Sequence, residues 1–199
     1  MSEENLLVRP ELTMPPAEAE ALRAGYAAAT NILEYGSGGS TVMAAEMSGK
    51  TIFSVESDRN WARAMNTWFR AHRPKSKLRL HYANIGPTGK WGMPENNQHY
   101  AKFHTYPLSV WQRPDFTHPD TVLIDGRFRA GCFLAVQYMI SHPVTVYFDD
   151  YTDRETYHDV ERFGAPVEII GRMARFELQP ARLENADLNW ILSVFTRKK

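Results

Sequence analysis

The sequence of 199 residues contains 23 lysine and arginine residues and 23 aspartate and glutamate residues, so its formal net charge is zero. Proteins that bind nucleic acid or anionic membranes usually carry an excess of basic residues, and this balance argues against both classes of partner. The length suits a single domain, and no apolar run approaches the roughly 20 residues that a membrane helix needs. We therefore expect one domain over residues 1–199, with no nucleic-acid or membrane partner.

The one cysteine, Cys132, has no partner for an internal disulfide. The first residues, MSEENLL, lack the basic and apolar pattern of an export signal, so we expect a cytoplasmic protein. The sequence leaves the oligomeric state open, and a homodimer is compatible with it.

Segments with helical and strand periodicity alternate over the first 83 residues. Residues 14–30 contain two prolines followed by many alanines, and proline is tolerated in a first helical turn, so we expect a helix there. Short apolar or alternating runs indicate strands, and apolar residues three and four apart indicate helices. The expected strands are 31–35, 51–57 and 77–83, and the expected helices are 40–47 and 58–72, with Trp61 and Trp68 in the core.

Residues 84–120 break this alternation and are rich in glycine, proline, asparagine, tryptophan and histidine. An irregular segment of this length in a compact domain is usually functional or mobile. We expect it to lie over one edge of the sheet, where its aromatic residues line a substrate pocket, form a lid or pack on the core. These residues are Trp91, Tyr100, Phe103, His104, Tyr106 and Trp111.

The last part of the chain returns to regular patterns. Strands are expected at 121–125 and 145–150, helices at 129–140 and 153–163, a strand, turn and strand over 167–180, and a last strand at 189–196. Strands that alternate with helices predict a mostly parallel sheet covered on both faces, and the closing hairpin adds antiparallel strands at one side. Ligands of such open sheets bind beyond the carboxyl ends of the strands.

The segment Glu34–Thr41, EYGSGGST, joins the first expected strand to a helix. Its glycines allow a ligand to approach the backbone, and the N–H groups that open the helix offer hydrogen bonds. Glu56 ends the next strand, 20 residues after Gly36, and an acid there suits the hydroxyls of a ribose. The dinucleotide fingerprint needs glycine where Thr41 stands, so we predict a different nucleoside site. The alternative is a tight turn followed by an exposed acid.

With an acid two residues before the first glycine, this segment resembles the class I S-adenosylmethionine-dependent methyltransferases, and the resemblance extends over nearly the whole chain. It implies a three-layer Rossmann-like methyltransferase sheet, mostly parallel with a C-terminal antiparallel hairpin, and S-adenosylmethionine as cofactor. Ser40 departs from the family, in which a third glycine is common at that place. The implied contacts are Glu34, Gly36 and Gly38 for the methionine portion, Glu56 for the ribose, and Asn84 and Ile85 for the adenine. Ser37, Ser57 and Asp125 are expected to contact the cofactor as well.

Three carboxylates follow two of the expected strands, Asp125 after one and Asp149 and Asp150 after the other. If these strands are neighbours, the carboxylates converge, and such a group needs a cation or a proton to offset its repulsion. Oxygen ligands of this kind suit Mg²⁺. The layout is similar to that of the metal-dependent small-molecule O-methyltransferases, and this resemblance implies all three as ligands of Mg²⁺, with Asp125 and Asp149 as catalytic residues.

Two alternatives concern the same residues. Asp150 lies where an acid caps the start of a helix. Three arginines nearby either bind an anionic substrate group or pair with the aspartates, and we favour pairing: Arg127, Arg129 and Arg154. The catalytic lysine of the catechol-type enzymes is absent after Asp125.

These features together predict an enzyme that transfers a methyl group from S-adenosylmethionine to oxygen or nitrogen of a small molecule. One alternative is a non-catalytic protein of the same fold that binds a nucleoside or acts as a scaffold. A second is an NAD-dependent oxidoreductase, which Thr41 and the closing antiparallel strands disfavour.

Overall fold

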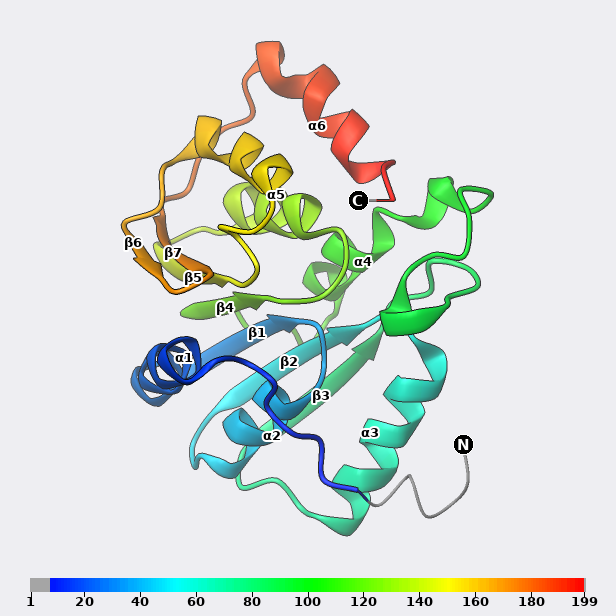
Figure 1. The fold of residues 1–199 in the computed structure, drawn as a ribbon, viewed down its shortest axis with the longest axis vertical. Coiled ribbons are helices and arrows are strands. Elements are labelled where there is room, and N and C mark those ends of the chain that lie inside the picture. The colour runs from blue at the N-terminus through cyan, green and yellow to red at the C-terminus, as the bar shows by residue number, and fades with distance from the viewer. Residues whose placement is uncertain (1–7, 199) are drawn as a thin grey trace.

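The computed structural model describes residues 8–198 and contains a seven-stranded sheet of order β3-β2-β1-β4-β5-β7-β6 (Figure 1). Neighbouring strands from β3 to β5 are parallel, whereas β7 lies antiparallel between β5 and β6. The predicted mostly parallel sheet with an antiparallel hairpin is therefore confirmed. The strands are β1 (Asn31–Tyr35), β2 (Thr51–Glu56), β3 (Lys77–Tyr82), β4 (Thr121–Ile124), β5 (Val144–Phe148), β6 (Glu168–Ile170) and β7 (Met173–Leu178).

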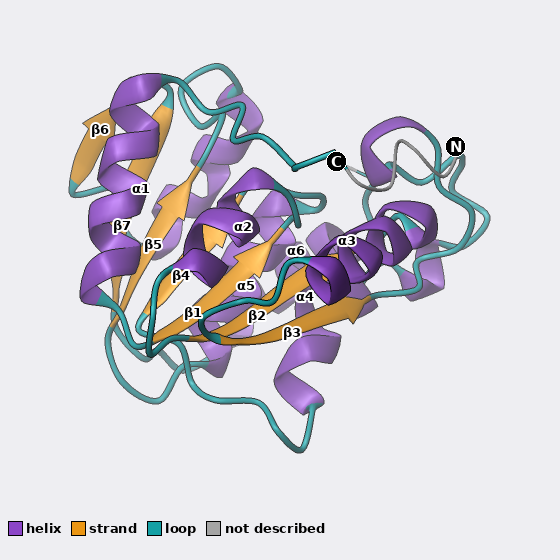
Figure 2. Ribbon diagram, turned by 90° about the horizontal axis from the view of Figure 1, so that it is seen from below, coloured by secondary structure: helices purple, strands orange, loops and turns teal. Residues whose placement is uncertain are grey.

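Helices cover both faces of this sheet, with α1, α2 and α3 on one face and α4, α5 and α6 on the other (Figures 1 and 2). The helices are α1 (Pro16–Ala28), α2 (Gly39–Glu46), α3 (Arg59–Ala71), α4 (Thr105–Leu108), α5 (Arg129–Met139) and α6 (Leu188–Phe195). The 3₁₀ segments are η2 (Lys90–Gly92), η3 (Tyr100–Lys102), η4 (Ser109–Gln112), η5 (Glu155–Phe163) and η6 (Asn185–Asp187). Within residues 8–198, none of these helices combines the length and apolar character that crossing a membrane requires.

Alternating side chains of the central strands enter two separate cores. In β1, Ile32 packs with Leu22 and Tyr26 of α1, whereas Leu33 packs on the other face with Phe133 of α5. Both neighbours in this strand are almost fully buried because the sheet is covered on both sides. The three-layer architecture follows directly from this pattern.

The register of the parallel strands brings their last residues to one edge. Tyr35 pairs with Val55 on one side and with Ile124 on the other, and Ile124 pairs with Phe148. The residues that directly follow these positions therefore lie at the same edge of the sheet. They include Gly36, Glu56, Asp125 and Asp149.

Two expectations about the last part of the chain need correction. Residues 189–196 are not a strand, because they form most of α6, where Ile191 and Val194 pack against Leu134 of α5. A short apolar run fits a buried strand or one face of a helix equally well, and the packing partner decides between them. The helix expected at 153–163 is a 3₁₀ segment over Glu155–Phe163.

Candidate functional site

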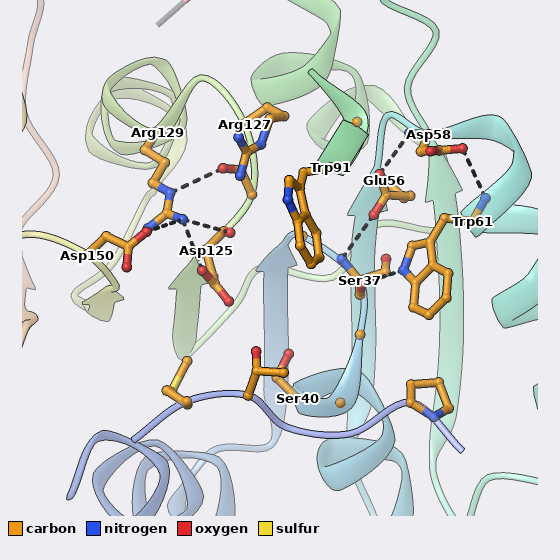
Figure 3. Close-up of a pocket in the computed structure, with 18 of the residues that line it drawn as sticks. Ser37, Ser40, Glu56, Asp58, Trp61, Trp91, Asp125, Arg127, Arg129 and Asp150 are labelled. Carbon is orange, nitrogen blue, oxygen red and sulfur yellow. Dashed lines mark hydrogen bonds and ion pairs between the residues drawn. The ribbon is translucent and has the colours of Figure 1, made fainter. Parts of the chain in front are cut away.

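A pocket of about 780 Å³ lies at the carboxyl ends of β1, β2, β4 and β5 (Figure 3). Its volume falls within the roughly 300–1,000 Å³ that is usual for small-molecule sites. The walls come from the glycine loop, the end of β2, residues 91–93, the loop after β4 and the N-terminal segment 10–14. The predicted position of the ligand site, at this edge of the sheet, has a cavity of suitable size.

The three glycines of the loop after β1 differ in what surrounds them. Gly36 has φ +107°, and a Cβ there would lie 2.9 Å from the backbone nitrogen of Gly126, so the two loops touch backbone to backbone. A Cβ on Gly39 would clash with the backbone at Leu12, because the segment 10–14 packs against it. A Cβ on Gly38 would meet nothing within 4 Å. Of the three, Gly38 is the one that opens onto free space for a ligand.

Thr41, which breaks the dinucleotide fingerprint, is buried at the start of α2. Its hydroxyl oxygen accepts a hydrogen bond from the Gly38 N–H at 3.0 Å and lies 3.2 Å from the Ser54 hydroxyl. The Ser37 hydroxyl lies 2.7 Å from the same Ser54 oxygen. Hydroxyl groups thus hold the loop against β2, and a glycine at position 41 would lose this connection.

Glu34 lies beneath the loop and does not line the pocket. Its side chain is fully buried, and its Oε1 accepts a hydrogen bond from the Tyr26 hydroxyl at 2.8 Å. Burial raises the pKa of this carboxyl, although hydroxyl groups such as that of Thr41 favour the charged form. The structure therefore places Glu34 as a support of the loop.

Glu56 lines the pocket at the end of β2. Its Oε1 accepts hydrogen bonds from the backbone N–H groups of Ser57 at 2.7 Å and Asp58 at 2.8 Å, and its Oε2 accepts one from Ser37 at 3.4 Å. Burial raises its pKa, while these backbone donors lower it. A carboxylate has about four acceptor positions, so a fixed Glu56 can still accept a ligand hydroxyl. Ser57 itself is buried, and its hydroxyl donates to the Gly92 carbonyl at 2.9 Å.

Asn84 and Ile85 lie outside the pocket wall. Ile85 is fully buried in the core, and the exposed Asn84 accepts a hydrogen bond from the Gly86 N–H at 3.1 Å through its own side chain. Residues 91–93 stand beside Glu56 instead, because the chain after β3 folds back through a bridge between Thr88 and Pro94. Trp91 was among the aromatic residues expected to line a pocket, whereas the place of Gly92 and Met93 beside Glu56 could not be predicted from the sequence.

Two tryptophans contribute to the pocket. Trp91 has φ +61° and is 74% exposed, and its ring projects between Asp125 and Ser37 (Figure 3). Trp61 was expected in the core, but it is 36% exposed and its Nε1 donates to the Ser37 carbonyl at 2.7 Å. It lies in the first turn of α3, next to the glycine loop, where helical spacing alone could not distinguish core from pocket. Trp68, two turns later, is buried as predicted.

The other aromatic residues of the irregular segment mainly pack on the protein. Phe103 and Tyr106 are buried, and Trp111 packs against the same core. Tyr106 also lines the pocket, whereas Tyr100 is exposed elsewhere. Most of these aromatic residues therefore pack on the core, while Trp91 and Tyr106 line the pocket.

The three aspartates after β4 and β5 are paired with arginines. Asp149, 1% exposed, accepts two hydrogen bonds from Arg172, Nε to Oδ1 at 3.0 Å and Nη2 to Oδ2 at 2.7 Å. Oδ2 of Asp150 lies 3.0 Å from Arg129 Nη2 and 3.1 Å from Arg154 Nη2. The charges of the cluster are thus balanced within the protein.

Arg129 connects the two strand ends. Its guanidinium is almost completely buried, with a side chain 4% exposed, and its Nη2 lies 3.1 Å from the carboxylate of Asp125. It also donates to the carbonyls of Gly126 and Asp125, each at 3.1 Å, and to that of Asp149. The predicted pairing holds for Arg129 and Arg154.

The expected magnesium ligands Asp125, Asp149 and Asp150 do not fit that ion. No group of three or more histidine, cysteine, aspartate or glutamate side chains in residues 8–198 is arranged to hold a metal. Guanidinium groups already pair with both oxygens of Asp149 and Asp150 and with Oδ1 of Asp125, and Asp149 does not line the pocket. The sequence could not indicate this, because Arg172 comes from the turn between β6 and β7, 23 residues after Asp149.

Asp125 is the carboxylate of this group whose environment favours the neutral form. Burial raises its pKa, and the charges of Asp149 and Asp150 raise it further against the opposing effect of Arg129, to about 7. Asp149 behaves differently, because hydrogen bonds from Arg172 outweigh the effect of its burial and lower its pKa. A carboxyl group that titrates near neutral pH and lines a pocket is suited to proton transfer.

No protein-family model and no curated protein matches the sequence significantly. A methyltransferase-like protein from Silicibacter pomeroyi is 51% identical with a TM-score of 0.91, over 94% of this chain and 98% of that one.

More distant solved structures share the fold. The O-methyltransferase TomG from Streptomyces achromogenes, crystallised in complex with S-adenosylmethionine, is 14% identical with a TM-score of 0.53, over 85% of this chain and 82% of that one. An S-adenosylmethionine-dependent O-methyltransferase from Thermotoga maritima is 10% identical with a TM-score of 0.56, over 89% of this chain and 69% of that one. At these identities the likeness concerns the fold alone.

Proposed function

Because the chain belongs to the class I S-adenosylmethionine-dependent methyltransferase family, we propose that it transfers a methyl group from S-adenosylmethionine to oxygen or nitrogen of a small molecule. The observation that carries this proposal is the placement of Glu56 in the pocket, held by three backbone N–H groups beside the open side of Gly38. TomG, which shares the fold, has been crystallised with this cofactor.

We assign the cofactor to the part of the pocket between the glycine loop and β2. There Glu56 accepts the ribose hydroxyls, and Gly38 leaves room for the methionine portion to lie against the backbone. Glu34 acts through the loop, because it is buried beneath it. When bound, S-adenosylmethionine supplies the electrophilic methyl group.

The residues of the chain then have two tasks, alignment and proton removal. A bond forms between the methyl carbon and the attacking atom as the carbon–sulfur bond breaks, and sulfur keeps the electron pair as a neutral thioether. Holding the attacking atom in line with the methyl group contributes much of the rate enhancement of such a transfer. Asp125, with a pKa of about 7, accepts the proton that the acceptor's hydroxyl or amino group releases. Asp149 is a positioning residue in this scheme. Its carboxylate binds Arg172, and its backbone carbonyl accepts a hydrogen bond from Arg129.

Calorimetry with S-adenosylmethionine, S-adenosylhomocysteine and NAD tests the cofactor. Both adenosyl compounds should bind and NAD should not. Glu56→Ala should weaken adenosyl binding about 10-fold or more, since hydrogen bonds to a charged group contribute about 1.5–3 kcal/mol. Glu20→Ala, an exposed acid of α1, is the matched control and should bind normally. If neither adenosyl compound binds, the proposal is wrong.

The alternative of a non-catalytic nucleoside-binding protein predicts the same calorimetry. It differs in turnover, which can be followed as S-adenosylhomocysteine released during incubation with hydroxylated and amino aromatic compounds. Release that depends on the acceptor, and that Asp125→Asn reduces, supports catalysis. Binding without acceptor-dependent release in any of these mixtures favours the scaffold.

A further inference from the structure

One arginine near the carboxyl ends of β4 and β5 takes no part in the ion pairs found there among the described residues. Three aspartates are matched there by three arginines: Asp125, Asp149 and Asp150 by Arg129, Arg154 and Arg172. The fourth arginine of this region, Arg127, lines the same pocket and is half-buried. In the part of the chain that the structure describes, no carboxylate forms an ion pair with it.

The backbone that carries Arg127 is fixed on both sides. The Arg127 carbonyl accepts a hydrogen bond from the Cys132 thiol at 3.3 Å, and the Gly126 carbonyl accepts one from Arg129 at 3.1 Å. The next residue, Phe128, has φ +52° and is buried against Phe103 and Tyr106. The guanidinium of Arg127 therefore extends from a rigid turn.

Arg127 lies on the opposite side of the pocket from Glu56. Figure 3 shows Asp125, Arg127 and Arg129 on one side, Glu56 and Trp61 on the other, and the ring of Trp91 between them. In the proposed function the cofactor lies on the side of Glu56. The side of Asp125 and Arg127 then faces the acceptor.

The chemistry of this side indicates what the acceptor carries. A half-buried charge without a partner is unfavourable, and a ligand anion would remove that cost. The guanidinium offers two parallel donors that match the two oxygens of a carboxylate. Beside it the exposed ring of Trp91 offers a flat apolar surface that suits an aromatic ring.

We propose that Arg127 binds the carboxylate of the methyl acceptor while the acceptor's ring rests against Trp91, so that the substrate is a small aromatic acid with a hydroxyl or amino group. This inference rests on the proposed function, because it uses the cofactor's place to define the acceptor's. Asp125, on the same side, then meets the group that is methylated.

The test compares 4-hydroxybenzoate with 4-hydroxybenzamide, which have similar size and differ in charge. Each is titrated by calorimetry into the protein saturated with S-adenosylhomocysteine, and each is also titrated without it. The wild type should bind the carboxylate about 10-fold or more tightly than the amide, since a charge-assisted pair contributes about 1.5–3 kcal/mol.

Variants of Arg127 and Trp91 separate the contribution of the guanidinium charge to binding from that of the tryptophan ring. Arg127→Gln should abolish the preference for the carboxylate, Arg127→Lys should keep part of it, and Arg63→Gln, an exposed arginine of α3, should keep all of it. Trp91→Leu should weaken both compounds by the same factor. Equal binding of the two compounds, no binding of either, or a preference that survives Arg127→Gln would overturn the inference.

Direct titration with S-adenosylhomocysteine distinguishes this failure from failure of the proposed function. Arg127→Gln should bind it as the wild type does, because Arg127 and Glu56 lie on different sides of the pocket. Normal binding without a carboxylate preference refutes the acceptor alone. Absence of adenosyl binding refutes the function itself.

Discussion

Asp149 and Arg172 form a two-point ion pair that joins the end of β5 to the turn between β6 and β7, with N–O distances of 3.0 and 2.7 Å. The carboxylate is 1% exposed, whereas the guanidinium is 32% exposed. The pair thus anchors the antiparallel part of the sheet to its parallel part, and Arg172 itself lines the pocket.

Removing the arginine of this pair should destabilise the protein strongly. Arg172→Ala leaves a buried carboxylate without its partner, and such a loss typically costs about 3–5 kcal/mol. Urea unfolding measures the free energy of unfolding. Arg175→Ala, which removes the more exposed pairs with Glu168 and Glu177, should cost at most about 1 kcal/mol. Equal losses in the two variants would contradict the burial argument.

The two carboxyl groups Asp125 and Asp149 should have opposite effects on stability as pH changes. The folded-state pKa of Asp125 is about 7 and its ordinary value 3.8, so the folded state holds more protons between these values. Stability therefore falls as pH rises through this window, and Asp125→Asn should reduce that fall. Melting temperatures between pH 4 and 8 test it. For Asp149 the pKa is lowered, so its contribution is present above about pH 4 and is lost as pH falls below that.

The same carboxyl group should control turnover. If Asp125 accepts the proton of the acceptor, kcat should rise with pH through about 7 as Asp125 becomes ionised. Asp125→Asn should lower kcat about 100-fold or more and remove this limb of the pH profile, while S-adenosylhomocysteine still binds. A profile that keeps its rise in the variant would assign the proton to another group.

Thr41→Val should loosen the glycine loop. The change keeps the size of the side chain and removes the oxygen that accepts the Gly38 N–H. Loss of a capping hydroxyl costs about 1 kcal/mol, and adenosyl binding should weaken as well. Thermal unfolding and calorimetry give the two values. Thr152→Val, at an exposed position, serves as the control and should change neither.

Neighbouring glycines should respond differently to a methyl group. Gly39→Ala places a Cβ against the backbone at Leu12 and should displace the segment 10–14, while Gly38→Ala meets open space. We expect Gly38→Ala to change the free energy of unfolding by less than about 0.5 kcal/mol. A larger loss of stability in Gly38→Ala than in Gly39→Ala would contradict this packing of the segment 10–14 against Gly39.

Much of the fold could be predicted from the sequence, because buried parallel strands such as 121–125 are short continuous apolar runs between helical segments. The site could be predicted where its residues end strands, as Glu56 and Asp125 do, since the parallel register brings strand ends together. In these places local pattern and tertiary structure agree.

The parts that could not be predicted depend on contacts between distant segments. Arg172 reaches Asp149 through the β6–β7 turn, and the exposure of Trp61 depends on where α3 begins beside the glycine loop. The place of residues 91–93 depends on how the irregular segment folds back. None of these contacts leaves a periodic signal in the chain.

The segment 10–14, which packs against Gly39 through Leu12, belongs both to the core and to the pocket wall. The segment 10–14 forms a wall of the pocket but contributes no strand to the sheet. A chain shortened to begin at α1 would keep all seven strands and lose that wall. Because Met14 of this segment is buried in the core, the shortened chain should also lose some thermal stability, and a sample that still folds would lack part of its binding site.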